Sequence, residues 1–138
     1  MFKLDERLQN DTALVTDLPL CRVLLMNDSQ FPWLILVPRV EGLAELHELD
    51  DWQMQQYVQE SRLCCKVLSS LYAPYKLNIA ALGNVVRQLH IHHLCRYEED
   101  IAWPAPVWGR QPAIPYGDSE LAARIEALKN AFSTEEKR

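Results

Sequence analysis

The sequence has 138 residues, which is about the length of one domain. Hydrophobic residues make up 49% and charged residues 24%, enough apolar content to offset the entropy of ordering, so a disordered chain is excluded. The formal net charge of −5 argues against sequence-independent binding to nucleic acid, because such binding depends on a basic surface.

No stretch of the sequence is typical of a membrane span or a secretion signal. The longest apolar run, from Phe31 to Val37, is far shorter than the roughly 20 residues that a span requires. The first residues are polar and charged, where a signal peptide would carry an apolar region. The four cysteines form no CxxC pair that would indicate structural zinc. We therefore expect a cytoplasmic protein with free thiols and no membrane contact.

Two short apolar runs predict the first pair of β-strands. Cys21–Met26 is followed by the turn-forming residues Asn27-Asp28-Ser29, and Trp33–Val37 is closed by Pro38. Because the connection between the two runs is short, we predict that they pair as an antiparallel hairpin.

The strongest helical pattern runs from Asp50 to Tyr72. Asp50 and Gln53 have the spacing of a capping box, in which each side chain satisfies a free backbone donor of the first turn. Small and apolar residues then recur at three- and four-residue spacing: Met54, Tyr57, Val58, Ser61, Cys65, Leu68, and Leu71 or Tyr72. Pro74 ends the pattern. A long helix with one such stripe is expected to lie on a sheet.

The second half of the chain predicts two more strands and a last helix. Leu77–Leu82 and Leu89–Arg96 read as strands joined through Gly83-Asn84. Trp103–Gly109 contains two prolines, which remove ladder donors, so we expect an extended, ordered loop there. Ser119–Phe132 is predicted as a C-terminal helix with Ser119 as its N-cap. We expect a single domain over residues 1–138, with a core of about 20–96 and a tail and helix over 101–132.

Three of the four histidines fall within one stretch of four residues, 90–93, in the last predicted strand. Because alternate residues of a strand share a face, Gln88, His90 and His92 are expected to point to one side. Two imidazoles on one face are suited to proton transfer and to nucleophilic attack near neutral pH. The opposite face carries Leu89, Ile91 and His93, so we expect His93 to be a packed, hydrogen-bonded residue.

A metal site at His90 and His92 is an alternative, since His-x-His on a strand can chelate. The only other histidine, His47, lies in an unrelated acidic stretch, and the sequence shows no second ligand cluster. We expect no resident metal or cofactor.

Residues 83–96, GNVVRQLHIHHLCR, resemble the signature of the histidine-triad (HIT) superfamily. In that signature a Gly-Gln-Ser/Thr-Val stretch leads into His-φ-His-φ-His-φ-φ, where φ is apolar, and an arginine often follows. The similarity covers roughly Leu20 to Arg96 and includes the order of the strands and the long helix. The Trp103–Gly109 segment is similar to that of a bacterial subgroup of HIT-family hydrolases.

The resemblance implies an α+β fold: an antiparallel sheet of about five strands, with one long helix packed on it and a C-terminal helix, usually forming a homodimer. It also implies a small-molecule nucleotide substrate that is cleaved at its α-phosphate through a covalent nucleotidyl-histidine. Dinucleoside polyphosphates and nucleoside phosphoramidates are the candidate substrates.

The resemblance also assigns roles to residues of this chain. His90 matches the nucleophile, and His92 matches the histidine that assists the leaving group. Asn27 matches the asparagine that bonds the ribose hydroxyls, and Asn84 stands near the phosphates. The amide of Gln88 and the guanidinium of Arg96 are further candidate donors to phosphoryl oxygens.

The chain departs from the signature at Gln88, which replaces the first histidine, and at His93, where an apolar residue is expected. In the family the first position orients the nucleophile through its backbone carbonyl, a role that a glutamine retains. The departure leaves one alternative open, a nucleotide-binding module with a degenerate triad that no longer turns its ligand over.

Overall fold

The computed structural model describes residues 1–137, and its sheet has five antiparallel strands in the spatial order β1-β2-β3-β5-β4. The strands are β1 Thr12–Asp17, β2 Cys21–Met26, β3 Trp33–Pro38, β4 Lys76–Ala80 and β5 Ile91–Arg96. The helices described are α1 Glu6–Asp11, the 3-10 helix η1 Leu46–Glu48, α2 Asp51–Tyr72 and α3 Asp118–Glu136. The predicted α+β class with an antiparallel sheet of about five strands is confirmed.

The predicted hairpin is present as β2 and β3. The two strands pair antiparallel, with Cys21 opposite Pro38 and Leu25 opposite Leu34. The next neighbour of β3 is β5, in which His92 lies opposite Ile35 and His93 opposite Leu34. The histidine-bearing strand is therefore held between β3 and β4 in the interior of the sheet.

Helix α2 begins as the sequence predicts, with the Asp50 side chain accepting from Gln53 N and the Gln53 side chain accepting from Asp50 N. It ends at Tyr72, and the C-cap residue Ala73 adopts a left-handed conformation (φ 43°) directly before Pro74. Its buried side differs from the predicted stripe at Val58, which is 50% exposed.

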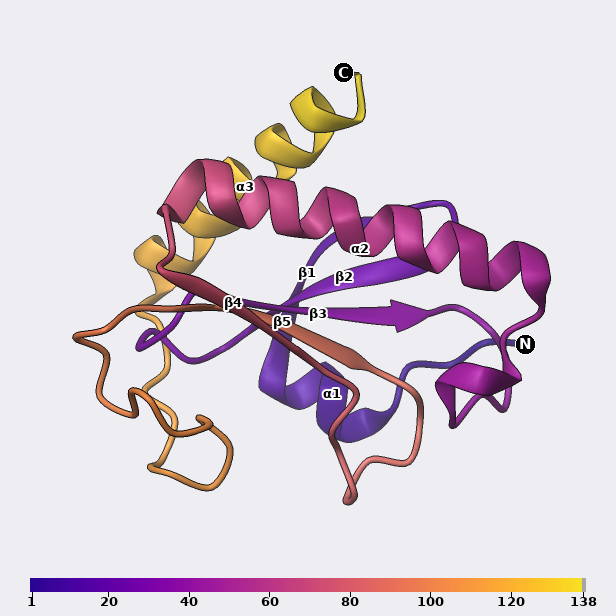
Figure 1. The fold of residues 1–138 in the computed structure, drawn as a ribbon, viewed down its shortest axis with the longest axis horizontal. Helices are drawn as coiled ribbons and strands as arrows, with labels where there is room; N and C mark the ends of the chain where they lie inside the picture. Colours follow the sequence, from indigo (N-terminus) through magenta and orange to yellow (C-terminus); the bar gives the residue numbers. More distant parts are fainter. Residues whose placement is uncertain (138) are drawn as a thin grey trace.

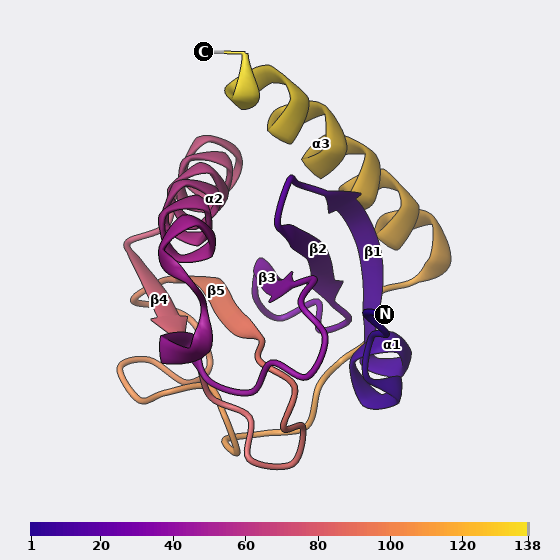
Figure 2. The ribbon, with the colours of Figure 1, turned by 90° about the vertical axis from the view of Figure 1, so that its right-hand side faces the viewer.

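The two long helices cover one face of the sheet, and shorter segments cover the other (Figures 1 and 2). Helices α2 and α3 pack against each other and enclose the larger core cluster. The opposite face carries a second cluster, defined by buried residues from α1, the sheet, the β2–β3 turn and the 101–108 segment: Leu8, Leu24, Phe31, Trp33, Ile35, Val37, Leu94, Ala102 and Val107. This second cluster lies on the side to which Trp33 and His92 project.

Two sequence predictions are corrected, both after β5. The N-terminal segment, for which the sequence predicted no element, forms α1 and the edge strand β1, whose register shifts between Leu14 and Thr16. Helix α3 starts at Asp118 after Gly117, so Ser119 is not its cap. The proline-rich segment folds into consecutive turns rather than an extended loop.

The turns after β5 have a specific cause in Asp100. Its carboxylate accepts hydrogen bonds from the backbone N–H groups of Tyr97, Ala102 and Trp103. One side chain therefore satisfies three main-chain donors and stabilises the consecutive turns at this point.

None of the helices within residues 1–137 is long and apolar enough to cross a membrane.

Candidate active site

The site is built around His90 and His92, at the start of β5. His90 directly precedes the strand and His92 is its second residue. Their rings lie on the same side, with centroids 5.1 Å apart, as the strand alternation predicts. Only 6% of His90 and 5% of His92 is exposed, so water has little access to either ring from the bulk.

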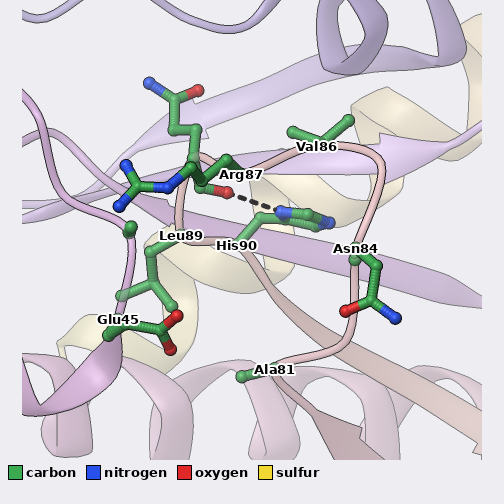
Figure 3. Close-up of a pocket in the computed structure, with 10 residues that line it drawn as sticks. Glu45, Ala81, Asn84, Val86, Arg87, Leu89 and His90 are labelled. Carbon is green, nitrogen blue, oxygen red and sulfur yellow. Dashed lines mark hydrogen bonds between the residues drawn. The ribbon is translucent and has the colours of Figure 1, made fainter.

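His90 is oriented by the main chain of Gln88. Its Nδ1 lies 2.8 Å from the Gln88 carbonyl oxygen, the bond drawn in Figure 3. Because a carbonyl oxygen only accepts, Nδ1 carries a proton, and in the neutral imidazole the lone pair is therefore on Nε2. A neutral imidazole in this state is a nucleophile through Nε2.

A pocket of about 140 Å³ adjoins His90. Its lining residues come from the loops before η1 and before β5: Ala44, Glu45, Ala81, Gly83, Asn84, Val86, Arg87, Gln88, Leu89 and His90. Figure 3 shows Glu45 and Asn84 on opposite sides of it. The volume is below the ~300–1,000 Å³ of typical small-molecule sites, so it suits a single group such as a phosphoryl group.

Gly83 lines the same pocket and lies directly against the ring of His90. A Cβ built on Gly83 would lie 2.4 Å from Nε2 of His90, which is too close for any side chain. The connection between the last two strands therefore requires a glycine at this position, because no residue with a Cβ atom fits there.

His92 is bonded at both ring nitrogens. The Trp33 indole N–H donates to Nδ1 at 3.0 Å, and Nε2 donates to the Leu82 carbonyl oxygen at 2.7 Å. The ring also packs against the indole of Trp108, with centroids 5.3 Å apart. Burial, with a further contribution from the neighbouring His90 and His93, lowers the pKa of His92 to about 4 against the opposing effect of the Leu82 bond.

The Gln88 side chain binds the N-terminal segment. Its Oε1 accepts from Asp5 N at 2.8 Å and its Nε2 donates to the Lys3 carbonyl oxygen at 2.9 Å. The sequence predicted this amide as a donor to substrate, whereas the structure commits both of its ends to the main chain.

Two further predicted site residues lie apart from His90. The Asn27 Oδ1 accepts from Tyr116 N at 2.9 Å, and Asn27 lines a separate pocket with Met26 and Pro115. Arg96 is 1% exposed, and its guanidinium donates to the carboxylate of Asp100 and to Asn78 Oδ1. The structure therefore brings Asn84 and Gln88 to His90 but not Asn27 or Arg96.

His93 lies on the opposite, helix-covered face, as predicted. It is fully buried, its Nδ1 donates to the Ile91 carbonyl oxygen, and the Ser61 hydroxyl donates to its Nε2 at 2.7 Å. Burial lowers the pKa of His93 to about 4, so it is a neutral packing residue.

The metal alternative does not fit the donor set at this site. The lone pair of His92 Nδ1 is taken by Trp33, and Nε2 carries the proton given to Leu82. His92 thus presents no free lone pair to a cation. Among residues 1–137, no group of three or more histidine, cysteine or acidic residues is placed to hold a metal ion.

Sequence reasoning missed Trp33 and Arg87. Trp33 lies opposite Leu94, so it is the diagonal neighbour of His92 across the β3–β5 pair and within reach of a large aromatic ring. The pairing of β3 with β5 would have revealed this contact, but the sequence predicted only the hairpins. Arg87 is exposed and lines the pocket beside His90. Its position within the motif gave no sign that its side chain would face the pocket.

Comparison with known proteins gives relatives over nearly the whole chain. The sequence pattern of the HIT domain family matches residues 7–99. The structure is similar to a histidine triad protein of Marinobacter aquaeolei VT8, with 46% identity, a TM-score of 0.94, and 97% of this chain and 98% of that chain covered. It is also similar to a histidine triad protein of Bradyrhizobium japonicum, with 40% identity, a TM-score of 0.92, and 95% and 98% covered.

A more distant likeness is to the diadenosine triphosphate hydrolase of Plasmodium falciparum, with 14% identity, a TM-score of 0.67, and 97% of this chain and 82% of that chain covered; it shows the fold alone. None of the curated proteins compared with the chain matches it.

Proposed function

This chain belongs to the histidine triad (HIT) family, and we propose that it is a hydrolase or nucleotidyl transferase acting at the α-phosphate of a nucleotide conjugate. The candidate substrates are dinucleoside polyphosphates and nucleoside phosphoramidates. The resemblance of residues 83–96 to the histidine-triad signature implies a nucleotide substrate of this kind.

One observation carries the proposal: Nδ1 of His90 is bonded to the Gln88 carbonyl oxygen, which leaves Nε2 as the ring nitrogen available for attack, and His90 lines a pocket that suits a phosphoryl group. The lone pair is fixed there because the Gln88 carbonyl oxygen holds the proton on Nδ1. A nucleophile held in one orientation removes much of the entropic part of the barrier.

In the first step, Nε2 of His90 attacks the α-phosphorus. A P–N bond forms, the bond from phosphorus to the leaving group breaks, and the leaving group keeps that electron pair. His90 then carries a positive charge, and its Nδ1–H still donates to the Gln88 carbonyl oxygen, which stabilises the charged ring.

In the second step, water or another acceptor attacks the same phosphorus and the P–N bond breaks. The electron pair returns to Nε2, so His90 is regenerated as the neutral imidazole. With water as acceptor the products are a nucleoside monophosphate and one proton released to solvent. Two displacements replace a single more difficult one.

The pocket also supplies groups for the charge on the phosphoryl oxygens. We propose that the Asn84 amide and the Arg87 guanidinium, which both line it, donate to these oxygens. Both are exposed and can reach a substrate at the mouth of the pocket.

The test is turnover of a panel of adenylated and guanylated conjugates by the wild type and by His90→Ala. We expect His90→Ala to abolish turnover and keep the fold, because only the nucleophile is lost. His47→Ala is the matched control, since His47 is an exposed histidine on η1 outside this pocket. Full activity of a cleanly purified His90→Ala protein would contradict the mechanism.

Nucleotide affinity measured in parallel separates the binding-module alternative. Tight binding of nucleotides without any turnover across the panel would favour that alternative over the enzyme. This alternative is motivated by the two departures from the signature, Gln88 and His93; the Gln88 side chain binds the main chain of Lys3 and Asp5.

A further inference from the structure

Trp33 and Leu82 permit only one form of His92. The indole N–H of Trp33 can only donate, so Nδ1 of His92 must accept, and the Leu82 carbonyl oxygen can only accept, so Nε2 must carry a proton. The neutral tautomer with its proton on Nε2 satisfies both partners. The imidazolium would set an N–H of His92 against the N–H of Trp33.

The surroundings of His92 also oppose a positive charge. The ring is 5% exposed and lies against Trp33 and Trp108, with centroid separations of 5.6 and 5.3 Å. The titratable groups that act on it are His90, at the start of β5, and His93, on the other face of the same strand, and both disfavour its protonation. Burial of the ring is the largest effect, and together these effects lower the pKa of His92 to about 4.

We propose that Trp33 is a positioning residue that holds His92 as a neutral Nε2–H donor, and that the site therefore selects leaving groups that depart as anions without taking a proton. This inference rests on the proposed function and narrows its substrate class to phosphoanhydrides, such as dinucleoside polyphosphates, over phosphoramidates.

The two substrate classes place different demands on His92. When a phosphoanhydride is cleaved, the P–O bond breaks and the electron pair stays on a weakly basic polyphosphate oxygen. That oxygen needs only a hydrogen bond, which His92 Nε2–H can give in place of its bond to the Leu82 carbonyl. No proton is transferred in this step.

A phosphoramidate has an amine as its leaving group. When its P–N bond breaks, the nitrogen keeps the electron pair and must gain a proton to leave as a neutral amine. A neutral His92 could supply that proton only by becoming an imidazolate anion, because Nδ1 carries no proton while it accepts from Trp33. The geometry therefore disfavours amine leaving groups.

The tautomer can be measured in the wild-type protein by ¹⁵N nuclear magnetic resonance at neutral pH. We expect the proton of His92 on Nε2 and a scalar coupling through the hydrogen bond between Trp33 Nε1 and His92 Nδ1. A proton on Nδ1 would overturn the inference. This readout needs no turnover, so it stands whether or not the proposed enzyme activity is found.

The selectivity is tested with Trp33→Phe, which keeps an aromatic ring and removes the donor. With Nδ1 free to take a proton, we expect the ratio of kcat/KM for a phosphoramidate to that for a phosphoanhydride of the same nucleotide to rise about tenfold or more. Trp108→Phe is the matched control, because Trp108 also contacts the His92 ring, yet its indole N–H has no partner among residues 1–137.

We expect Trp108→Phe to leave the His92 tautomer and the substrate ratio as they are in the wild type. An unchanged ratio in Trp33→Phe, an equal rise in both variants, or a wild type that prefers phosphoramidates would each overturn the inference. Absence of turnover with every substrate would instead contradict the proposed function, while the tautomer measurement would still decide the role of Trp33.

Discussion

The carbonyl oxygen of Gln88 lies 2.8 Å from Nδ1 of His90, so the orientation of the nucleophile depends on the main chain at position 88 and not on its side chain. The side chain of Gln88 is engaged elsewhere, with the backbone of Lys3 and Asp5. A glutamine at this position is therefore compatible with an oriented His90.

The first prediction concerns Gln88→Ala. We expect turnover close to that of the wild type, because the carbonyl that holds His90 remains. The free energy of unfolding should fall by about 1–2 kcal/mol, since two partly exposed hydrogen bonds to the N-terminal segment are lost. Steady-state kinetics and urea unfolding check the two effects separately.

Gln88→Glu provides an intermediate case, since a carboxylate can accept from Asp5 N but cannot donate to the Lys3 carbonyl. The free energy of unfolding of Gln88→Glu should lie between that of the wild type and that of Gln88→Ala. A folded Gln88→Ala protein without activity would show that the side chain takes part in the reaction, contrary to this account.

The second prediction concerns Gly83→Ala. The added Cβ would fall 2.4 Å from Nε2 of His90, so the loop or the ring must shift. A displacement of this kind should lower kcat/KM about 10²-fold. Gly117→Ala is the matched control, because its Cβ meets nothing within 4 Å, and equal activities of the two variants would refute the close approach.

The third prediction concerns the ion pair of Arg96 and Asp100, whose side chains are 2% and 5% exposed. Burial would raise the pKa of Asp100, but the Arg96 and main-chain bonds hold it below its usual value. Asp100→Asn leaves the Arg96 charge uncompensated and should lower the free energy of unfolding by about 3–5 kcal/mol.

Asp17→Asn is the comparison for this ion pair, since Asp17 and Arg22 are about one-third exposed and their bridge should be worth about 1 kcal/mol or less. Denaturant unfolding of the two variants should differ accordingly. Similar losses in both would mean that the Arg96 network is not buried as described.

The fourth prediction is a loss of stability on mild acidification. The pKa values of His92 and His93 are lowered from 6.5 to about 4 in the folded protein. Below about pH 6.5 the unfolded chain therefore binds more protons than the folded one, and the free energy of unfolding falls until the pH reaches about 4. The total effect is on the order of a few kcal/mol for each histidine.

Unfolding in urea at pH 7, 6 and 5 measures this slope, and His93→Asn should make it shallower than that of the wild type. The range stops at pH 5 because carboxylates begin to titrate below it. Identical slopes for His93→Asn and the wild type would mean that His93 does not titrate as a buried neutral group.

Much of the fold could be predicted because the relevant signals are local. The Asp50–Gln53 capping box and the three- to four-residue periodicity fixed the start and length of α2. The short turn at Asn27 indicated the β2–β3 hairpin. Helix α1 and strand β1 gave no such signal, because α1 has six residues and β1 is an edge strand with a single fully buried residue, Val15.

The candidate site could be predicted only in part, for a related reason. Strand alternation places His90 and His92 on one side, and that relation depends only on residues 90–92, where the chain enters β5. The partners Trp33 and Leu82 depend on how distant segments pair, which the sequence did not specify. Arg96 looked available as a ligand because no pattern showed that Asp100 would occupy it.

The most direct measurement of the central claim is the location of a nucleotidyl group on the protein during turnover. A reaction with a dinucleoside polyphosphate is stopped within milliseconds to seconds by denaturation at alkaline pH, where a P–N bond to histidine survives, and the peptides are weighed by mass spectrometry. We predict one nucleotidyl group on His90 and none in His90→Asn. Product formed without any adduct in a single turnover, or an adduct on a different residue, would contradict the account.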